Sequence, residues 1–112
     1  MTTASVIRVV IAMGVFIASS ALADDTVAGS GEQIYQRWCT ACHGAGADKP
    51  GTGALEFKYK GAVPAELEKR VDLSADLVKY FVRHGVSIMP PFRKTEITDA
   101  ELDALARYLS KK

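Results

Sequence analysis

The sequence lacks most of the features that mark large or strongly charged proteins. It has 112 residues, so it can form one small domain but not a doubly wound sheet, a barrel enzyme or a long repeat array. Lys and Arg number 14 against 13 Asp and Glu, which gives no electrostatic reason to expect nucleic-acid binding. It has two cysteines, two histidines, three methionines and one tryptophan. Each of these scarce side chains can therefore be considered individually.

The first 23 residues have the pattern of a secretory signal peptide. Arg8 is the one charged residue of this segment, and an apolar run over 9–18 follows it. The segment ends in Ala-Leu-Ala at 21–23, which matches a small-x-small cleavage pattern. The alternative is an uncleaved membrane anchor, but the run is shorter than the roughly 18–20 apolar residues that a spanning helix needs. We predict a signal peptide at 1–23 and one exported domain at 24–112.

Cleavage would leave 89 residues, too few to bury a large core. Thirteen basic and thirteen acidic side chains would remain, because Arg8 leaves with the signal. Met89 would become the single methionine, since Met1 and Met13 also leave. A chain this short is marginally stable alone, so a covalent staple or a bound cofactor is expected.

The spacing of apolar residues predicts an all-α domain of three or four short helices with long loops. Helices are expected from near Gly31, from Pro64 as a short piece, over 75–84 after Ser74, and after a Thr98–Glu101 capping box. The glycine-rich segment 44–53 predicts a loop, and 54–62 is expected to be extended. Gly85 is expected to end the third helix, and the Pro-Pro pair that follows excludes helix and central strand.

The strongest chemical signal is Cys39-Thr40-Ala41-Cys42-His43. Two thiols at this spacing can form thioethers with two vinyl groups on one porphyrin edge, and His43 then points at the iron from the proximal side. Three other interpretations fit less well. They are a structural disulfide, a redox dithiol, which needs a βαβ setting, and a zinc site, for which His84 is the one further ligand.

Met89 is the candidate for the second axial ligand. A thioether opposite histidine raises the reduction potential of haem iron. Met89 lies 46 residues after His43, in a loop stiffened by Pro90 and Pro91. His84 is the alternative, but its place at the end of a predicted helix favours a surface role, where a cationic side chain suits the helix dipole. A vacant position would suit a sensor or peroxidase, and the sequence offers no obvious polar distal group for either.

These residues resemble the class I c-type cytochromes over most of 31–110. The family has a glycine and an aromatic residue before CxxCH, matched by Gly31 and Tyr35. It also has a leucine and an aromatic residue in a C-terminal helix, matched by Leu105 and Tyr108. The resemblance implies the cytochrome c fold, with short helices wrapped around one covalently bound haem c. It also implies a close crossing of the terminal helices at the glycine.

The resemblance further implies partners for the proximal histidine and for the haem propionates. Family members usually have a proline whose carbonyl accepts the Nδ1–H of that histidine, which makes the ligand more basic. Pro50 is one candidate here, and an alternative register puts Ala54 at that position. Trp38, Tyr59 and Arg93 are candidates by residue type for the propionates.

The predicted function is single-electron transfer in the bacterial periplasm, with no bond chemistry on a substrate. Electrons would pass from a dehydrogenase to an oxidase or another carrier, through the haem edge near Cys39 and Cys42. The balanced charge predicts a weakly charged or mainly apolar docking face. The short loops and the Met-Pro-Pro-Phe segment at 89–92 also resemble those of cytochrome subunits of flavocytochrome dehydrogenases for alkylphenols and alcohols. This resemblance implies the alternative, a permanent electron-transfer subunit of such a flavoprotein dehydrogenase, marked by an exposed apolar patch around Ile88 and Phe92. We expect no nucleic-acid partner and no stable membrane insertion after signal cleavage.

Overall fold

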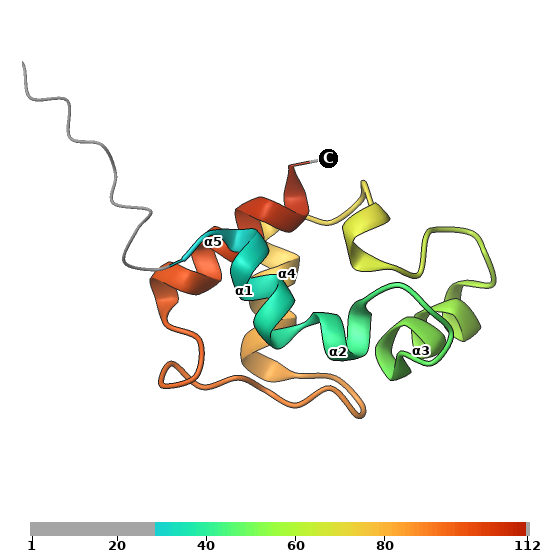
Figure 1. Cartoon of the computed structure of the whole chain (residues 1–112), viewed down its shortest axis with the longest axis horizontal. Helices are drawn as coiled ribbons and strands as arrows, with labels where there is room; N and C mark the ends of the chain where they lie inside the picture. The colour runs from blue at the N-terminus through green and yellow to red at the C-terminus, as the bar shows by residue number, and fades with distance from the viewer. Residues whose placement is uncertain (1–28, 112) are drawn as a thin grey trace, which may run out of the picture.

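The computed structural model describes residues 29–111, so the predicted signal peptide at 1–23 lies outside the described residues. In chain order the described elements are α1 (Gly31–Trp38), α2 (Thr40–His43), α3 (Pro50–Tyr59), η1 (Leu67–Lys69), α4 (Ala75–His84) and α5 (Asp99–Ser110). Figure 1 shows their arrangement. The all-α prediction is confirmed, because the β-pairing recorded within 29–111 is one isolated bridge between Val86 and Met89. In this range, no helix combines the length and the apolar character that a membrane crossing requires.

Side-chain caps set the starts of three helices. Ser30 and Gln33 form a capping box on α1, and Thr98 and Glu101 form another on α5. Ser74 caps α4 by accepting a hydrogen bond from a backbone amide of the first turn. Each cap satisfies amides that have no partner inside the helix. The starts predicted at Ser74 and Thr98 are thus confirmed.

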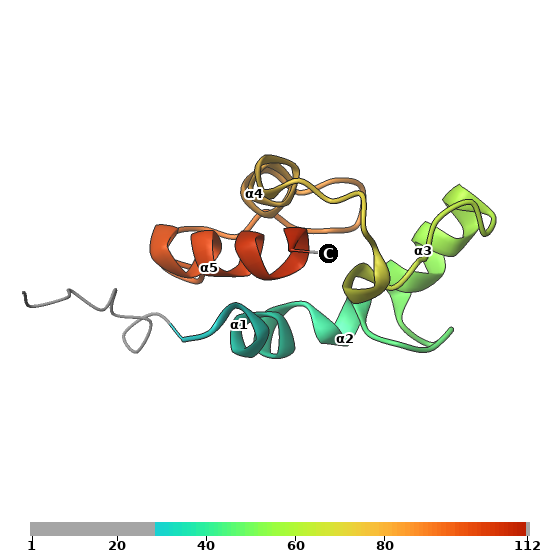
Figure 2. The same ribbon diagram turned by 90° about the horizontal axis from the view of Figure 1, so that it is seen from above.

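The core forms around α5, which lies between α1 and α4 (Figure 2). Tyr35 of α1, Leu105 of α5 and Ile97 before α5 have no exposed surface. A Cβ atom built on Gly31 would lie 2.3 Å from the carbonyl oxygen of Ala104. Only glycine therefore permits α1 to approach α5 this closely. The predicted close crossing of the terminal helices at Gly31 is confirmed.

The segment between α2 and α4 differs from its prediction. The expected extended loop at 54–62 is wrong over most of its length, because α3 runs from Pro50 to Tyr59. Proline at the first helical position suits a helix start, since its missing N–H has no intrahelical partner there. The apolar residues of α3 point to different sides, and Phe57 is 83% exposed, so the helix lacks the regular stripe that periodicity detects.

The structure also differs from the predictions at the CxxCH motif and at the short helix expected after Pro64. The first helix ends at Trp38 and restarts as α2 at Thr40, so the CxxCH motif lies on a separate short helix. The helical piece expected from Pro64 is a single turn, η1, over Leu67–Lys69. In Figure 2, α3 lies apart from the α1–α4–α5 core, beyond α2.

Candidate functional site

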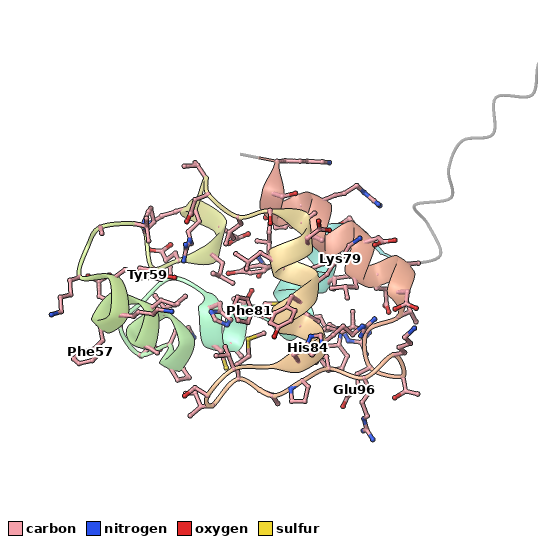
Figure 3. All side chains as sticks on the ribbon, turned by 180° about the vertical axis from the view of Figure 1, so that it is seen from behind. Phe57, Tyr59, Lys79, Phe81, His84 and Glu96 are labelled. Atoms are coloured by element: carbon pink, nitrogen blue, oxygen red, sulfur yellow. The ribbon has the colours of Figure 1, made fainter. Side chains whose placement is uncertain are left out.

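An apolar cavity of about 860 Å³, including its open mouth, lies between the core helices and α3. Leucine, valine and phenylalanine side chains from α3, η1, α4, α5 and the loops on either side of α4 make up most of its wall. Phe81, labelled in Figure 3, is one of the wall residues supplied by α4. Cys39, His43 and Met89 also line this cavity. The fold therefore brings together a thiol, an imidazole and a thioether that are up to 50 residues apart in the sequence.

The two cysteines of the motif differ in environment. Cys39 lines the cavity, where burial and the neighbouring Cys42 thiol raise its pKa to about 12. Cys42 is exposed on the following turn, outside the cavity lining. Both are free thiols, so the disulfide interpretation is not realised. No three Cys, His, Asp or Glu side chains meet as a metal site among the described residues, so the zinc interpretation gains no support.

His43 is the last residue of α2, and its ring packs against α3. A Cβ on Gly51 would lie 2.8 Å from the Nδ1 atom, so the ring contacts the backbone beside Pro50. Within residues 29–111, the buried Nδ1 atom has no hydrogen-bond partner. Burial lowers the pKa of His43, which favours the neutral imidazole, the form that binds a metal. Gly51 is absent from the sequence-based candidates, because a glycine in a glycine-rich segment carries no distinguishing signal.

Met89 reaches the cavity from a tight turn after α4. The amide of Val86 donates to the carbonyl oxygen of Met89 at 3.0 Å, and the amide of Met89 donates back at 2.9 Å. Gly85 precedes the turn with φ of +68°, as the predicted helix stop requires. The Phe92 amide donates to the Val82 carbonyl oxygen at 2.8 Å, which ties the far end of the loop to α4.

His84, the alternative axial ligand, lies away from these groups. Its Nδ1 atom is 2.8 Å from the carbonyl oxygen of Tyr80, and its ring stacks on the Tyr80 ring with centroids 4.3 Å apart. The side chain is exposed and is not part of the cavity wall. Figure 3 shows it at the end of α4, next to the loop that follows. This placement matches the surface role expected for it.

Three polar side chains, Lys58, Tyr59 and Arg70, line one part of the cavity. Arg70 is only 6% exposed and donates two hydrogen bonds to the carboxylate of Asp72, at 2.8 and 2.5 Å. Its guanidinium lies 4.8 Å from the centre of the Tyr59 ring. The hydrogen bond with Arg70 lowers the pKa of the Asp72 carboxyl. Sequence reasoning missed Arg70 because an arginine in a polar loop is usually exposed.

Of the three propionate candidates, the structure places only Tyr59 at the cavity. Trp38 packs edge-on against Phe92, with ring centroids 5.8 Å apart. Arg93 is exposed and pairs with Glu96. Neither residue is part of the cavity wall.

The composition of the wall fits a flat, largely apolar group that carries a metal and acidic substituents. The apolar side chains would cover the faces of such a group, and the nitrogen and sulfur atoms of His43 and Met89 are ligands that suit iron in a porphyrin. Lys58 and Arg70 supply positive charge for the acidic groups.

The sequence is also similar to those of known proteins. Residues 26–109 match the protein family described as cytochrome C oxidase, cbb3-type, subunit III. The chain is 32% identical over 102 residues to the 4-cresol dehydrogenase (hydroxylating) cytochrome c subunit of Pseudomonas putida, which covers 91% of this chain and 77% of that protein. It is also 32% identical over 108 residues to cytochrome c6 of Gloeothece citriformis, which covers 96% and 90% respectively.

Proposed function

Because the chain belongs to the cytochrome c family and transfers electrons with a covalently bound haem c, we propose which residues perform this function. Cys39 and Cys42 are the attachment sites, and His43 and Met89 are the axial ligands of the iron. The observation that carries this assignment is the apolar cavity lined by Cys39, His43 and Met89 together. The prediction of a small c-type cytochrome is confirmed.

The protein contributes ligands, orientation and exclusion of water. Bound haem c supplies an iron that accepts and donates one electron. The lowered pKa of the half-buried His43 favours its neutral form, which offers a nitrogen lone pair. The Val86–Met89 turn holds the thioether at the cavity. With both His43 and Met89 holding the bound iron, the chain would leave no open position for a substrate, which supports a carrier that performs no bond chemistry itself.

The surroundings support two finer assignments. Since the His43 ring packs against Gly51, the carbonyl of the adjacent Pro50 is a better candidate acceptor for Nδ1–H than that of Ala54. The propionates would face Lys58, Tyr59 and Arg70, because these are the polar side chains that line the cavity. Trp38 and Arg93 are not proposed for this role.

The ligand assignment is tested by comparing Met89→Ala with His84→Ala after export and haem maturation. Mass spectrometry should show one added haem in both variants, because the attachment cysteines are intact. Met89→Ala should lose the weak long-wavelength absorption of thioether-bound ferric iron and have a lower reduction potential. His84→Ala should match the parent protein. A parental spectrum and potential in Met89→Ala would remove Met89 from the site.

We also propose that residues 1–23 direct export and that the mature domain, 24–112, resides in the periplasm. The segment has the charge, apolar run and small-residue ending of a signal peptide. N-terminal sequencing of the haem-loaded protein from a periplasmic extract should begin at Asp24. A haem-loaded chain that retains Met1, or that stays with the membrane fraction, would contradict the proposal.

A permanent subunit of a dehydrogenase complex is the second candidate. It is favoured by the similarity to a protein named as a dehydrogenase cytochrome subunit. Ile88 is 74% exposed and Val86 is 53% exposed, and Val86 also lines the cavity, so an apolar surface adjoins the haem site. Phe92, expected in the exposed apolar patch with Ile88, is instead half-buried against Trp38. The exposed apolar surface therefore consists of Val86 and Ile88.

The two candidates differ in their behaviour during purification. A free carrier should elute as a monomer, whereas a subunit should co-purify with a flavoprotein, and Ile88→Ser should release it. In either case the balanced charge predicts a modest salt dependence of association. A fall in association rate of about a hundredfold or more across physiological salt would contradict an apolar docking face.

A further inference from the structure

The carbonyl groups at the end of α2 need hydrogen-bond partners from outside the helix. With only four residues, α2 has no later turn to supply amides to its last carbonyls. Its C-terminal residue is His43, and Gly44 follows as the cap. The position of the iron ligand thus depends on what binds these carbonyl groups.

Two side chains from other helices bind them. The hydroxyl of Tyr35, in α1, donates to the carbonyl oxygen of His43 at 2.8 Å. The hydroxyl of Thr52, in α3, donates to the carbonyl oxygen of Gly44 at 2.7 Å. Both side chains are buried, so water does not compete freely for either contact. The end of α2 is therefore held by one hydrogen bond from α1 and one from α3.

The hydroxyl of Tyr35 has a role that the aromatic ring alone cannot fill. The ring belongs to the core and lies 6.1 Å from the ring of Tyr108, centroid to centroid. A phenylalanine would supply the same packing but would leave the His43 carbonyl without this donor.

We propose that Tyr35 is a positioning residue for His43, holding the carbonyl of the ligand residue so that the imidazole keeps a fixed orientation toward the iron. This inference rests on the proposed ligation by His43. Because α1 is packed against α5 at Gly31, the hydroxyl connects the orientation of the ligand to the buried contact between these two helices. Thr52 provides the second attachment, on the side of α3.

The test compares Tyr35→Phe with Tyr108→Phe in the haem-loaded protein. Each variant removes one hydroxyl from a neighbouring tyrosine of the same cluster. The Tyr108 hydroxyl donates to the carboxylate of Glu68, which belongs to η1 and not to α2. The loss of this hydroxyl therefore serves as the matched control. Paramagnetic NMR of the ferric protein reads the orientation of His43, and amide hydrogen exchange reads the local opening of α2.

In Tyr35→Phe the hyperfine-shifted His43 signals should move. Exchange of the His43 and Gly44 amides should accelerate by about twofold to tenfold, which corresponds to the net loss of one hydrogen bond. These amides donate to the carbonyl oxygens of Cys39, which caps the start of α2, and of Thr40, so they report that helix. In Tyr108→Phe both readouts should stay at the parental values. Parental signals and rates in Tyr35→Phe, or equal changes in both variants, would overturn the proposal.

Thr52 keeps the inference testable if Tyr35→Phe yields no haem-loaded protein. Thr52→Val should accelerate exchange at Gly44, and Thr52→Ser should restore the parental rate because it restores the hydroxyl. An unchanged rate of Gly44 amide exchange in Thr52→Val would contradict the stabilisation of α2 by side-chain hydrogen bonds. Failure of His43 ligation is separately visible, since His43→Ala would then keep the parental absorption spectrum.

Discussion

His43 and Met89 reach the same cavity from segments that are fixed in different ways. His43 ends a four-residue helix that depends on hydroxyl groups from α1 and α3. Met89 lies in a turn closed by two hydrogen bonds between backbone groups of Val86 and Met89 themselves. The position of His43 is thus specified by side chains distant in the sequence, and the position of Met89 by local backbone conformation. These two parts of the molecule are called the His43 side and the Met89 side.

The two sides should therefore respond to different substitutions. Removal of a hydroxyl should disturb the His43 side, where side chains satisfy carbonyl groups. Addition of a methyl group should disturb the Met89 side, because a Cβ on Gly85 would lie 2.4 Å from the Met89 carbonyl oxygen. The backbone there also adopts positive φ at Gly85 and at Ser87, a conformation in which side chains cause strain.

The largest expected effect comes from removing each proposed ligand in turn. His43→Ala should give little haem-loaded protein, and any that forms should lose its low-spin spectrum, because the imidazole adjoins the proposed attachment cysteines. Met89→Ala should still be loaded, and its reduction potential should fall by on the order of 0.1 V, a fraction of the range that axial ligands cover. Redox titration and haem-stained gels measure both quantities. If the two variants had equal haem loading and equal reduction potentials, the His43 side and the Met89 side would not differ in this way.

The next effect concerns the helix crossing that supports the His43 side. Gly31→Ala would place a methyl group 2.3 Å from the Ala104 carbonyl oxygen and should cost about 2–3 kcal/mol of unfolding free energy. Gly53→Ala is the matched control, because its nearest neighbour, the Ala47 carbonyl oxygen, is 3.7 Å away. Alanine is also the better helix former, so this control should be neutral or slightly stabilising. Chemical denaturation of the haem-loaded variants measures the difference, and comparable midpoints would show that the crossing tolerates a side chain.

The Met89 side is probed by Gly85→Ala, with Gly61→Ala as its control. Both glycines have positive φ, but a Cβ on Gly61 would meet no atom within 4 Å. Gly61→Ala should cost about 1 kcal/mol from backbone strain alone, whereas Gly85→Ala should cost about 2 kcal/mol and displace the turn. Only Gly85→Ala should make Met89 easier to replace by added imidazole in the ferric protein. The same imidazole affinity in both variants would mean that the turn adjusts without moving the thioether.

The sequence allows good predictions where chemistry or capping imposes a pattern. Cysteine and histidine at fixed spacing indicate the cofactor by themselves, and Thr98 with Glu101 marks the start of α5. Met89, the single methionine of the predicted mature chain, lies at the cavity, and its scarcity together with its proline-stiffened loop made it the candidate. These features are local or scarce, so they can be recognised without knowledge of the fold.

Features that depend on a tertiary partner could not be predicted in this way. The role of the Tyr35 hydroxyl depends on a backbone carbonyl, which has no sequence signature. The burial of Arg70 depends on its contacts with Asp72 and with the Tyr59 ring. The helix α3 was missed because its apolar side chains face a cavity on one side and solvent on the other, so they do not follow the period of a core helix.

The smallest expected effect is a gain, and it isolates backbone strain on the Met89 side. Ser87 and Lys60 both have positive φ, at 53° and 50°. Glycine at either position relieves strain of about 1 kcal/mol but adds freedom to the unfolded chain, so each variant should gain about 0.5 kcal/mol or less. Their effects on Met89 should differ: Ser87→Gly should slow its replacement by imidazole about twofold, because the turn forms more readily, and Lys60→Gly should not. Faster replacement in Ser87→Gly would show that the serine side chain, rather than the backbone, holds the turn in place.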